Sequence, residues 1–232
     1  MSTVDRRSPA ITPPLVPGQR LGRATFHARY EAMPPSTRAE LIGGVVHMPS
    51  PLSYDHGDEN GPIVLWLMHY QRFTPGVRTS LNTSTLLDDQ AEAQPDASLR
   101  ILPESGGRSR HEGPYIAGAP ELVVEIARSS RRVDLDPKLR DYERAGVLEY
   151  VVSALGPDEL LWHARRDDRL VLVAPDAADG LHRSAAFRGL WLDPVALVAG
   201  DLDALVAALD RGLATDEHRA FVDLLAGRRD AH

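Results

Sequence analysis

Gln94-Pro95-Asp96-Ala97-Ser98-Leu99 opens the part of the chain that decides its fold. Two more segments complete it: Glu121-Leu122-Val123-Val124-Glu125-Ile126-Ala127 and Asp134-Leu135-Asp136-Pro137-Lys138-Leu139-Arg140-Asp141-Tyr142. The first segment alternates in polarity and the second is a short apolar run, as in β-strands. The third has an acidic residue that can cap a helix and a proline that suits a first turn. We therefore expect two strands followed by a helix.

Each of the two expected strands carries one acid. Glu125 is the only charge in the apolar run 122–127, and an ionised carboxylate in a buried strand is costly unless it is paired or binds a metal. Asp96 shares a strand face with Ser98 and Arg100. With Lys138 on the following helix, this pattern indicates a metal-dependent hydrolase site. The plainer alternatives are that Asp96 is a strand-edge acid and that an arginine neutralises Glu125. Arg128 and Arg131 are the nearest candidates for that pairing.

Composition limits the classes of protein and of metal site. The 232 residues are 43% hydrophobic and 25% charged, which is ordinary for one globular domain with an appended helical piece. There is no cysteine, so a metal would be held by carboxylates, carbonyls or histidine, which favours Mg²⁺ or Mn²⁺. No apolar run has the length of a membrane span, and residues 1–19 lack a signal-peptide core. We expect a cytoplasmic protein that does not bind membranes.

The net charge of −7 argues against a protein that coats nucleic acid electrostatically, although a nuclease needs only a local basic rim. Five arginines near Glu125 offer such a rim or are solvated loop charges: Arg108, Arg110, Arg128, Arg131 and Arg132.

The expected organisation is an arm over residues 1–19, a domain over 20–192 and a helical extension over 193–232. A hairpin is expected over 38–48, with Gly43-Gly44 as its turn. Further expected elements are helices over 25–32 (with Thr25 as cap) and 54–73, strands over 77–87, 96–102 and 148–154, and a hairpin from 159 to 174. A polar bend is expected over 88–93 and a mobile loop over 103–118.

The ordered set of motifs resembles a known family. Pro-Asp at 95–96, Glu125 in its apolar strand, Asp134…Lys138…Tyr142, Ala-Gly-Val at 145–147 and Glu-Tyr at 149–150 are similar to the Uma2 family of putative restriction endonucleases, within the PD-(D/E)XK nuclease superfamily. The resemblance spans about residues 38–152. It implies an α/β fold, a restriction-endonuclease-like mixed sheet flanked by helices, here with a helical C-terminal extension. It also implies a magnesium-dependent endonuclease that acts on DNA, as a homodimer.

The resemblance also assigns roles to residues. Asp96 and Glu125 would hold the metal, Glu40 would assist them, and Lys138 would act on the attacking water or the phosphate. His56 stands where the family tends to have a histidine. Three of these residues have plainer alternatives. Glu40 also fits a solvent-exposed acid of the hairpin, and Lys138 also fits an ion-pair partner of Asp134 or a surface lysine. His56 also fits a surface or capping residue.

The chain departs from the family pattern at several positions. Ala127 stands two residues after Glu125, where the superfamily has lysine, and Ser153 stands where aspartate is common. The turn Arg128-Ser129-Ser130 replaces the usual Ser-Pro-Ser-Thr. An alternative function is therefore a catalytically inactive nuclease-fold protein that acts in binding or regulation, or a scaffold whose C-terminal helices dock another protein.

Overall fold

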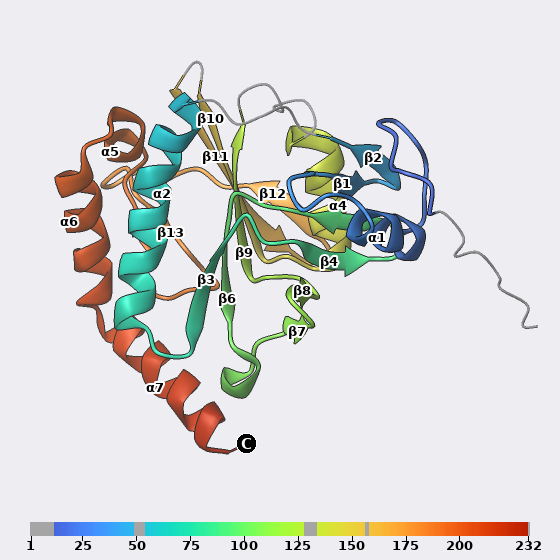
Figure 1. Ribbon diagram of the computed structural model, residues 1–232. Helices are drawn as coiled ribbons and strands as arrows, with labels where there is room; N and C mark the ends of the chain where they lie inside the picture. The colour runs from blue at the N-terminus through green and yellow to red at the C-terminus, as the bar shows by residue number, and fades with distance from the viewer. Residues whose placement is uncertain (1–11, 49–53, 128–133, 156–157, 232) are drawn as a thin grey trace, which may run out of the picture.

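The chain folds as a mixed α/β protein with two six-stranded sheets and a group of C-terminal helices (Figure 1). The computed structural model describes residues 12–48, 54–127, 134–155 and 158–231. Both large sheets are mixed, and helices flank them. The predicted fold class is confirmed. Within the described ranges, no helix is both long and apolar enough to cross a membrane.

The central sheet has the strand order β12-β11-β10-β9-β6-β3. Its strands are β3 (Val77–Leu81), β6 (Ala97–Ile101), β9 (Leu122–Ala127), β10 (Glu149–Leu155), β11 (Asp158–Arg166) and β12 (Arg169–Leu172). Only β9 and β10 run parallel, and the other neighbours are antiparallel. All six residues of β9 are buried, as its apolar run predicts, so Glu125 stands inside the protein.

One face of the central sheet is covered by helices from both ends of the chain (Figure 1). These are α2 (Tyr54–Phe73), α5 (Pro194–Ala199), α6 (Leu202–Leu213) and α7 (Asp216–Asp230). They share one core, in which Trp66 and Tyr70 of α2 meet Leu205 and Leu209 of α6. Trp66 and Tyr70 also donate hydrogen bonds to the backbone carbonyls of Trp191 and Arg188. A small sheet of β13 (His182–Arg183) and β14 (Trp191–Leu192) precedes α5.

The flanking sheet lies on the other side of the central sheet, with α1 (Arg23–Glu31) and α4 (Leu139–Ala145) (Figure 1). Its order is β2-β1-β5-β4-β8-β7. The strands are β1 (Glu40–Ile42), β2 (Val45–His47), β4 (Thr85–Asp88), β5 (Ala91–Ala93), β7 (Arg110–Glu112) and β8 (Tyr115–Ala117). Gly43 and Gly44 form the predicted two-residue turn with φ of 57° and 73°, values that glycine adopts without a steric penalty.

Several expected elements were wrong in detail. The single strand expected over 77–87 is divided between the two sheets at Asn82, whose φ of 47° breaks the extended backbone. The expected bend over 88–93 contains β5, and the expected loop over 103–118 contains a 3-10 turn (η1, Pro103–Ser105), β7 and β8. Helix α1 begins two residues before Thr25, with Gly22 at the N-cap position. Asp134 opens a π-helical turn (η2, Asp134–Lys138) that leads into α4.

Candidate active site

Asp96 and Glu125 face each other across two paired strands. In the antiparallel register of β6 and β9, Ala97 pairs with Val124 and Ser98 with Val123, so Asp96 stands opposite Glu125. Residues directly opposite in such a pair have Cα atoms about 4.5–5.5 Å apart and side chains on the same face. The Asp96 Oδ2 atom accepts a hydrogen bond of 2.7 Å from the backbone N–H of Ile126. This bond fixes the carboxylate of Asp96 against the backbone of β9, one residue beyond Glu125.

Lys138 lies between two of the carboxylates. Its Nζ atom is 3.0 Å from Glu125 Oε1 and 3.2 Å from Glu40 Oε1. All three side chains are buried, with exposed fractions of 7%, 4% and 10%. Glu40 is the first residue of β1, and Lys138 is the last residue of η2. Segments 98 residues apart in the sequence therefore meet at one ammonium group, which neutralises part of the buried negative charge.

Two further groups complete the site, and the sequence assigned neither of them a role in it. The hydroxyl of Tyr142 donates a 2.8 Å hydrogen bond to Glu125 Oε1, and the backbone N–H of Gln94 donates a 2.7 Å bond to Glu40 Oε1. Burial and the nearby Glu125 carboxylate raise the pKa of Tyr142 well above its ordinary value, so the phenol keeps its proton and stays a donor. In the sequence, Tyr142 belongs to the motif Asp134…Lys138…Tyr142 without a role of its own. Its spacing of four residues from Lys138 places both on one helical face and was the available signal.

Other candidate residues lie elsewhere. His56 belongs to the first turn of α2, but its side chain is outside the described part of the structure, as are Arg128, Arg131 and Arg132. Arg108 donates a 2.7 Å hydrogen bond to the carbonyl of Gly146, and Arg110 pairs with Glu112 at 3.0 Å. Within the described residues, neither of these two arginines contacts the carboxylates of Glu40, Asp96 or Glu125.

The donor set suits a hard divalent cation. Among the residues that the structure describes, no group of three or more His, Asp or Glu is placed to hold a metal ion. Mg²⁺ is usually bound through one or two carboxylates, with water and substrate oxygens completing the octahedron. Asp96 and Glu125 would supply the two carboxylates of that pattern. A metal there would share Glu125 with Lys138, whose ammonium group lies on Oε1.

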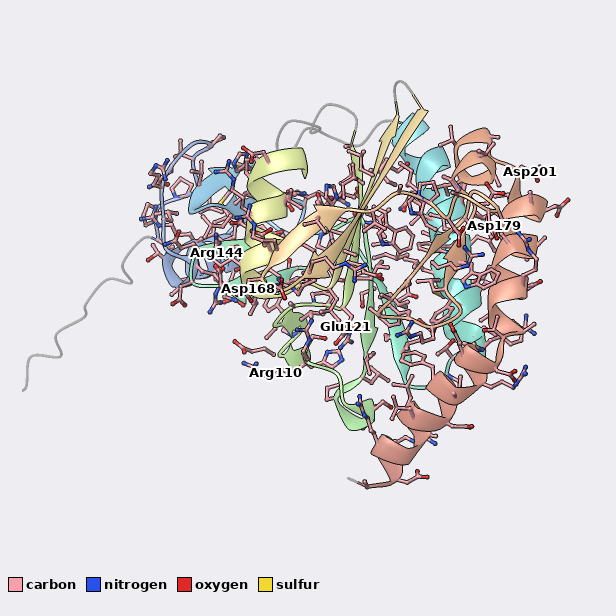
Figure 2. All side chains as sticks on the ribbon, turned by 180° about the vertical axis from the view of Figure 1, so that it is seen from behind. Arg110, Glu121, Arg144, Asp168, Asp179 and Asp201 are labelled. Atoms are coloured by element: carbon pink, nitrogen blue, oxygen red, sulfur yellow. The ribbon has the colours of Figure 1, made fainter. Side chains whose placement is uncertain are left out.

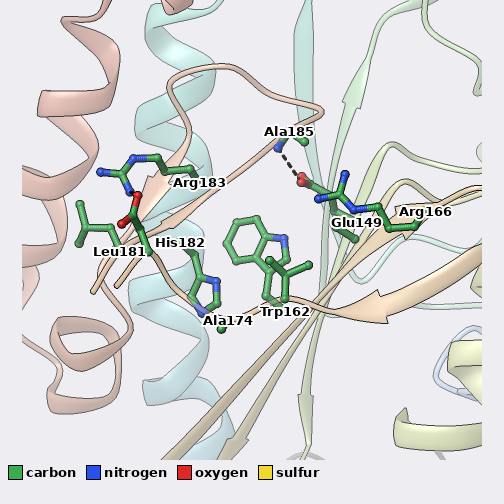
Figure 3. A pocket seen from close by; sticks show the side chains of 11 residues that line it. Glu149, Trp162, Arg166, Ala174, Leu181, His182, Arg183 and Ala185 are labelled. Carbon is green, nitrogen blue, oxygen red and sulfur yellow. Dashed lines mark hydrogen bonds and ion pairs between the residues drawn. The ribbon is translucent and has the colours of Figure 1, made fainter. Parts of the chain in front are cut away.

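A pocket of about 190 Å³ lies on the opposite face of the central sheet (Figure 3). Glu149 lines this pocket, as do Trp162 and His182, whose rings stack with centroids 5.2 Å apart. Burial raises the pKa of Glu149, which accepts hydrogen bonds from the Ser184 hydroxyl and the Ala185 N–H. These bonds fasten the segment before β14 to the sheet, so we assign this group a structural role.

Comparison with known proteins gives two matches. The model of the Uma2 family, described as "Putative restriction endonuclease", matches residues 24–196. A crystal structure of a putative nuclease belonging to DUF820, from Anabaena variabilis, has a similar fold with a TM-score of 0.57. The two chains share 17% sequence identity over 74% of this chain and 96% of that one. No curated protein matches this chain at a significant level.

Proposed function

Because this chain belongs to the Uma2 family, described as putative restriction endonucleases, we propose that it is a metal-dependent endonuclease that hydrolyses DNA phosphodiester bonds. The observations that support the proposal are the buried contacts of Lys138 with Glu125 and Glu40, and the hydrogen bond from the Ile126 N–H, next to Glu125, to Asp96. Glu125 lies on β9, and Asp96 directly precedes β6. Such strands hold catalytic groups in a fixed geometry.

Each residue of the site has a task in this proposal. Mg²⁺ or Mn²⁺, held by Asp96 and Glu125, would supply charge stabilisation at phosphorus and a more acidic water. Lys138 is held in position by Glu40 and Glu125, and from there its ammonium group would donate to the attacking water or to a phosphate oxygen. Tyr142 fixes the orientation of Glu125. Lys138 would thus replace the lysine that the superfamily has at the position of Ala127.

The alternative is an inactive nuclease-fold protein that binds a partner or nucleic acid. The observation in its favour is that Lys138 already bonds to two carboxylates, so a metal ion must compete with an ion pair that is complete without it. This alternative predicts a folded protein that binds no divalent metal at the site. The enzyme is favoured by the contact of Lys138 with Glu125 and by the hydrogen bond that ties Asp96 to the residue after Glu125.

The test is cleavage of supercoiled plasmid and of single-stranded DNA in Mg²⁺ and in Mn²⁺. We expect Glu125→Gln and Lys138→Met each to lower the cleavage rate at least about a hundredfold, as for the loss of acid–base groups. Glu149→Gln is the matched control, because Glu149 is a buried glutamate on the neighbouring strand but on the other face. Equal cleavage by the wild type and Glu125→Gln would refute the proposed site. The two-fold homodimer expected of such an enzyme is checked by light scattering.

A further inference from the structure

Arg100 is a buried arginine on the same strand as the candidate active site. It is only 2% exposed and belongs to β6, four residues beyond Asp96 and on the same face. On the neighbouring edge strand β3, Arg78 pairs with it in register. Like charges that stand directly opposite each other destabilise a sheet. Two adjacent arginines therefore need an explanation beyond packing.

The guanidinium group of Arg100 lacks the partners that a buried cation requires. Its Nη2 atom is 3.0 Å from His111 Nε2, whereas its Nε and Nη1 atoms are buried without a hydrogen-bond partner in the described structure. Burial, and next the charge of Arg78, lower the pKa of Arg100. The charges of Glu121 and Glu104 act in the opposite direction, but the Glu121 carboxylate accepts its hydrogen bonds from the backbone N–H groups of Ile101 and Arg108. Arg100 and Glu121 form no ion pair within the described ranges.

The surroundings of this arginine pair favour an anion. Residues 77–87, which include the whole of β3, contain no acid in a chain whose net charge is −7. Arg78 is exposed and gives solvent access to the pair. Arg110, which Figure 2 labels, lies on β7 of the flanking sheet. Arg110 is ion-paired with Glu112, so its charge is already compensated.

We propose that Arg78 and Arg100 form a subsite that binds a backbone phosphate of the nucleic-acid substrate at a distance from the bond that is cut. The proposal rests on the nuclease function proposed above. Four residues of strand span about 13 Å, since a strand rises about 3.4 Å per residue. A phosphate bound there would lie about 13 Å from the scissile one, a few nucleotides away along the substrate. Arg78 makes the first contact, and rotation of the His111 ring opens Arg100 to the same phosphate.

The test is the salt dependence of DNA binding by the full chain. A labelled 20-base-pair duplex is titrated without divalent metal, so that no cleavage occurs, at several NaCl concentrations. We expect Arg78→Gln and Arg100→Met each to weaken binding at least about tenfold, as for the loss of a charge-assisted hydrogen bond. We also expect each to reduce the slope of log K against log salt by about 0.9. Arg110→Gln, on the hairpin that carries His111, is the matched control and keeps the wild-type slope.

A stability measurement separates this role from a structural one. Arg100→Met removes a buried charge that forms no ion pair among the described residues, so its melting temperature should equal or exceed that of the wild type. Unchanged slopes and affinities in both variants would overturn the subsite, even if the wild type cleaves DNA. If the wild type binds inorganic phosphate but not DNA, a nucleic-acid subsite is also refuted. Conversely, reduced slopes without any cleavage by the wild type would support the subsite and refute the proposed endonuclease.

Discussion

Lys138→Met tests the ion-pair network at the centre of the candidate site. Methionine keeps an unbranched side chain but removes the ammonium group that lies 3.0 Å from Glu125 and 3.2 Å from Glu40. Removing one partner of a buried pair costs about 3–5 kcal/mol, because the remaining charge is left uncompensated. For a chain of this size, that loss lowers the melting temperature by about 6–20 °C. We therefore expect a large loss of unfolding free energy in urea.

Mg²⁺ should restore part of this loss. In the variant the metal no longer shares Glu125 with an ammonium group, so metal binding should strengthen while cleavage is lost. A ligand at a hundred times its dissociation constant stabilises the folded state by about 2.7 kcal/mol. The measurement is urea unfolding with and without Mg²⁺. Arg140→Gln is the control: its exposed ion pair with Asp136 should contribute no more than about 1 kcal/mol. Two results would refute this reasoning. One is a free energy of unfolding for Lys138→Met within about 1 kcal/mol of the wild-type value. The other is a free energy of unfolding for Lys138→Met that Mg²⁺ does not change.

Two further predictions concern buried hydrogen bonds. Tyr142→Phe removes the hydroxyl that donates a hydrogen bond to Glu125. The variant should lower the free energy of unfolding in urea by about 1.5–3 kcal/mol. An unchanged free energy would show that this bond does not hold the Glu125 carboxylate. His218 is buried between the Thr74 hydroxyl and the Leu213 carbonyl, and burial lowers its pKa. The folded state therefore disfavours protonation of His218. The contribution of neutral His218 to stability is present above the unfolded pKa of about 6.5 and is lost as pH falls through the folded pKa. His218→Gln should make the loss of stability between pH 7 and 5 less steep, and an equally steep loss would contradict this assignment.

The sequence predicts the central elements of this fold well because their patterns are local. Strand β9 matches its apolar run, and α4 ends at Ala145, before Gly146 with a φ of 95°. The motif order places Glu125 on β9 and Asp96 directly before β6, and these two strands are neighbours in the sheet. Their role as metal ligands stays a prediction.

The parts that sequence reasoning missed depend on tertiary contacts. Nothing in residues 77–87 shows that β3 and β4 belong to different sheets, because the change of direction occurs at one residue, Asn82. The polar residues 103–118 read as a loop, yet β7 and β8 pair there and extend the flanking sheet. Tyr142 fits a core pattern whether or not its hydroxyl has a partner. Such features are visible only when distant segments are placed together.

The most direct test of the account is calorimetric titration of Mg²⁺ and Mn²⁺ into the wild type, Glu125→Gln and the control Glu149→Gln. If Asp96 and Glu125 hold the metal, the wild type and the control bind it and Glu125→Gln does not. A folded wild-type protein that binds neither ion, or a Glu125→Gln variant that binds as well as the wild type, would contradict a metal-dependent site at these two carboxylates.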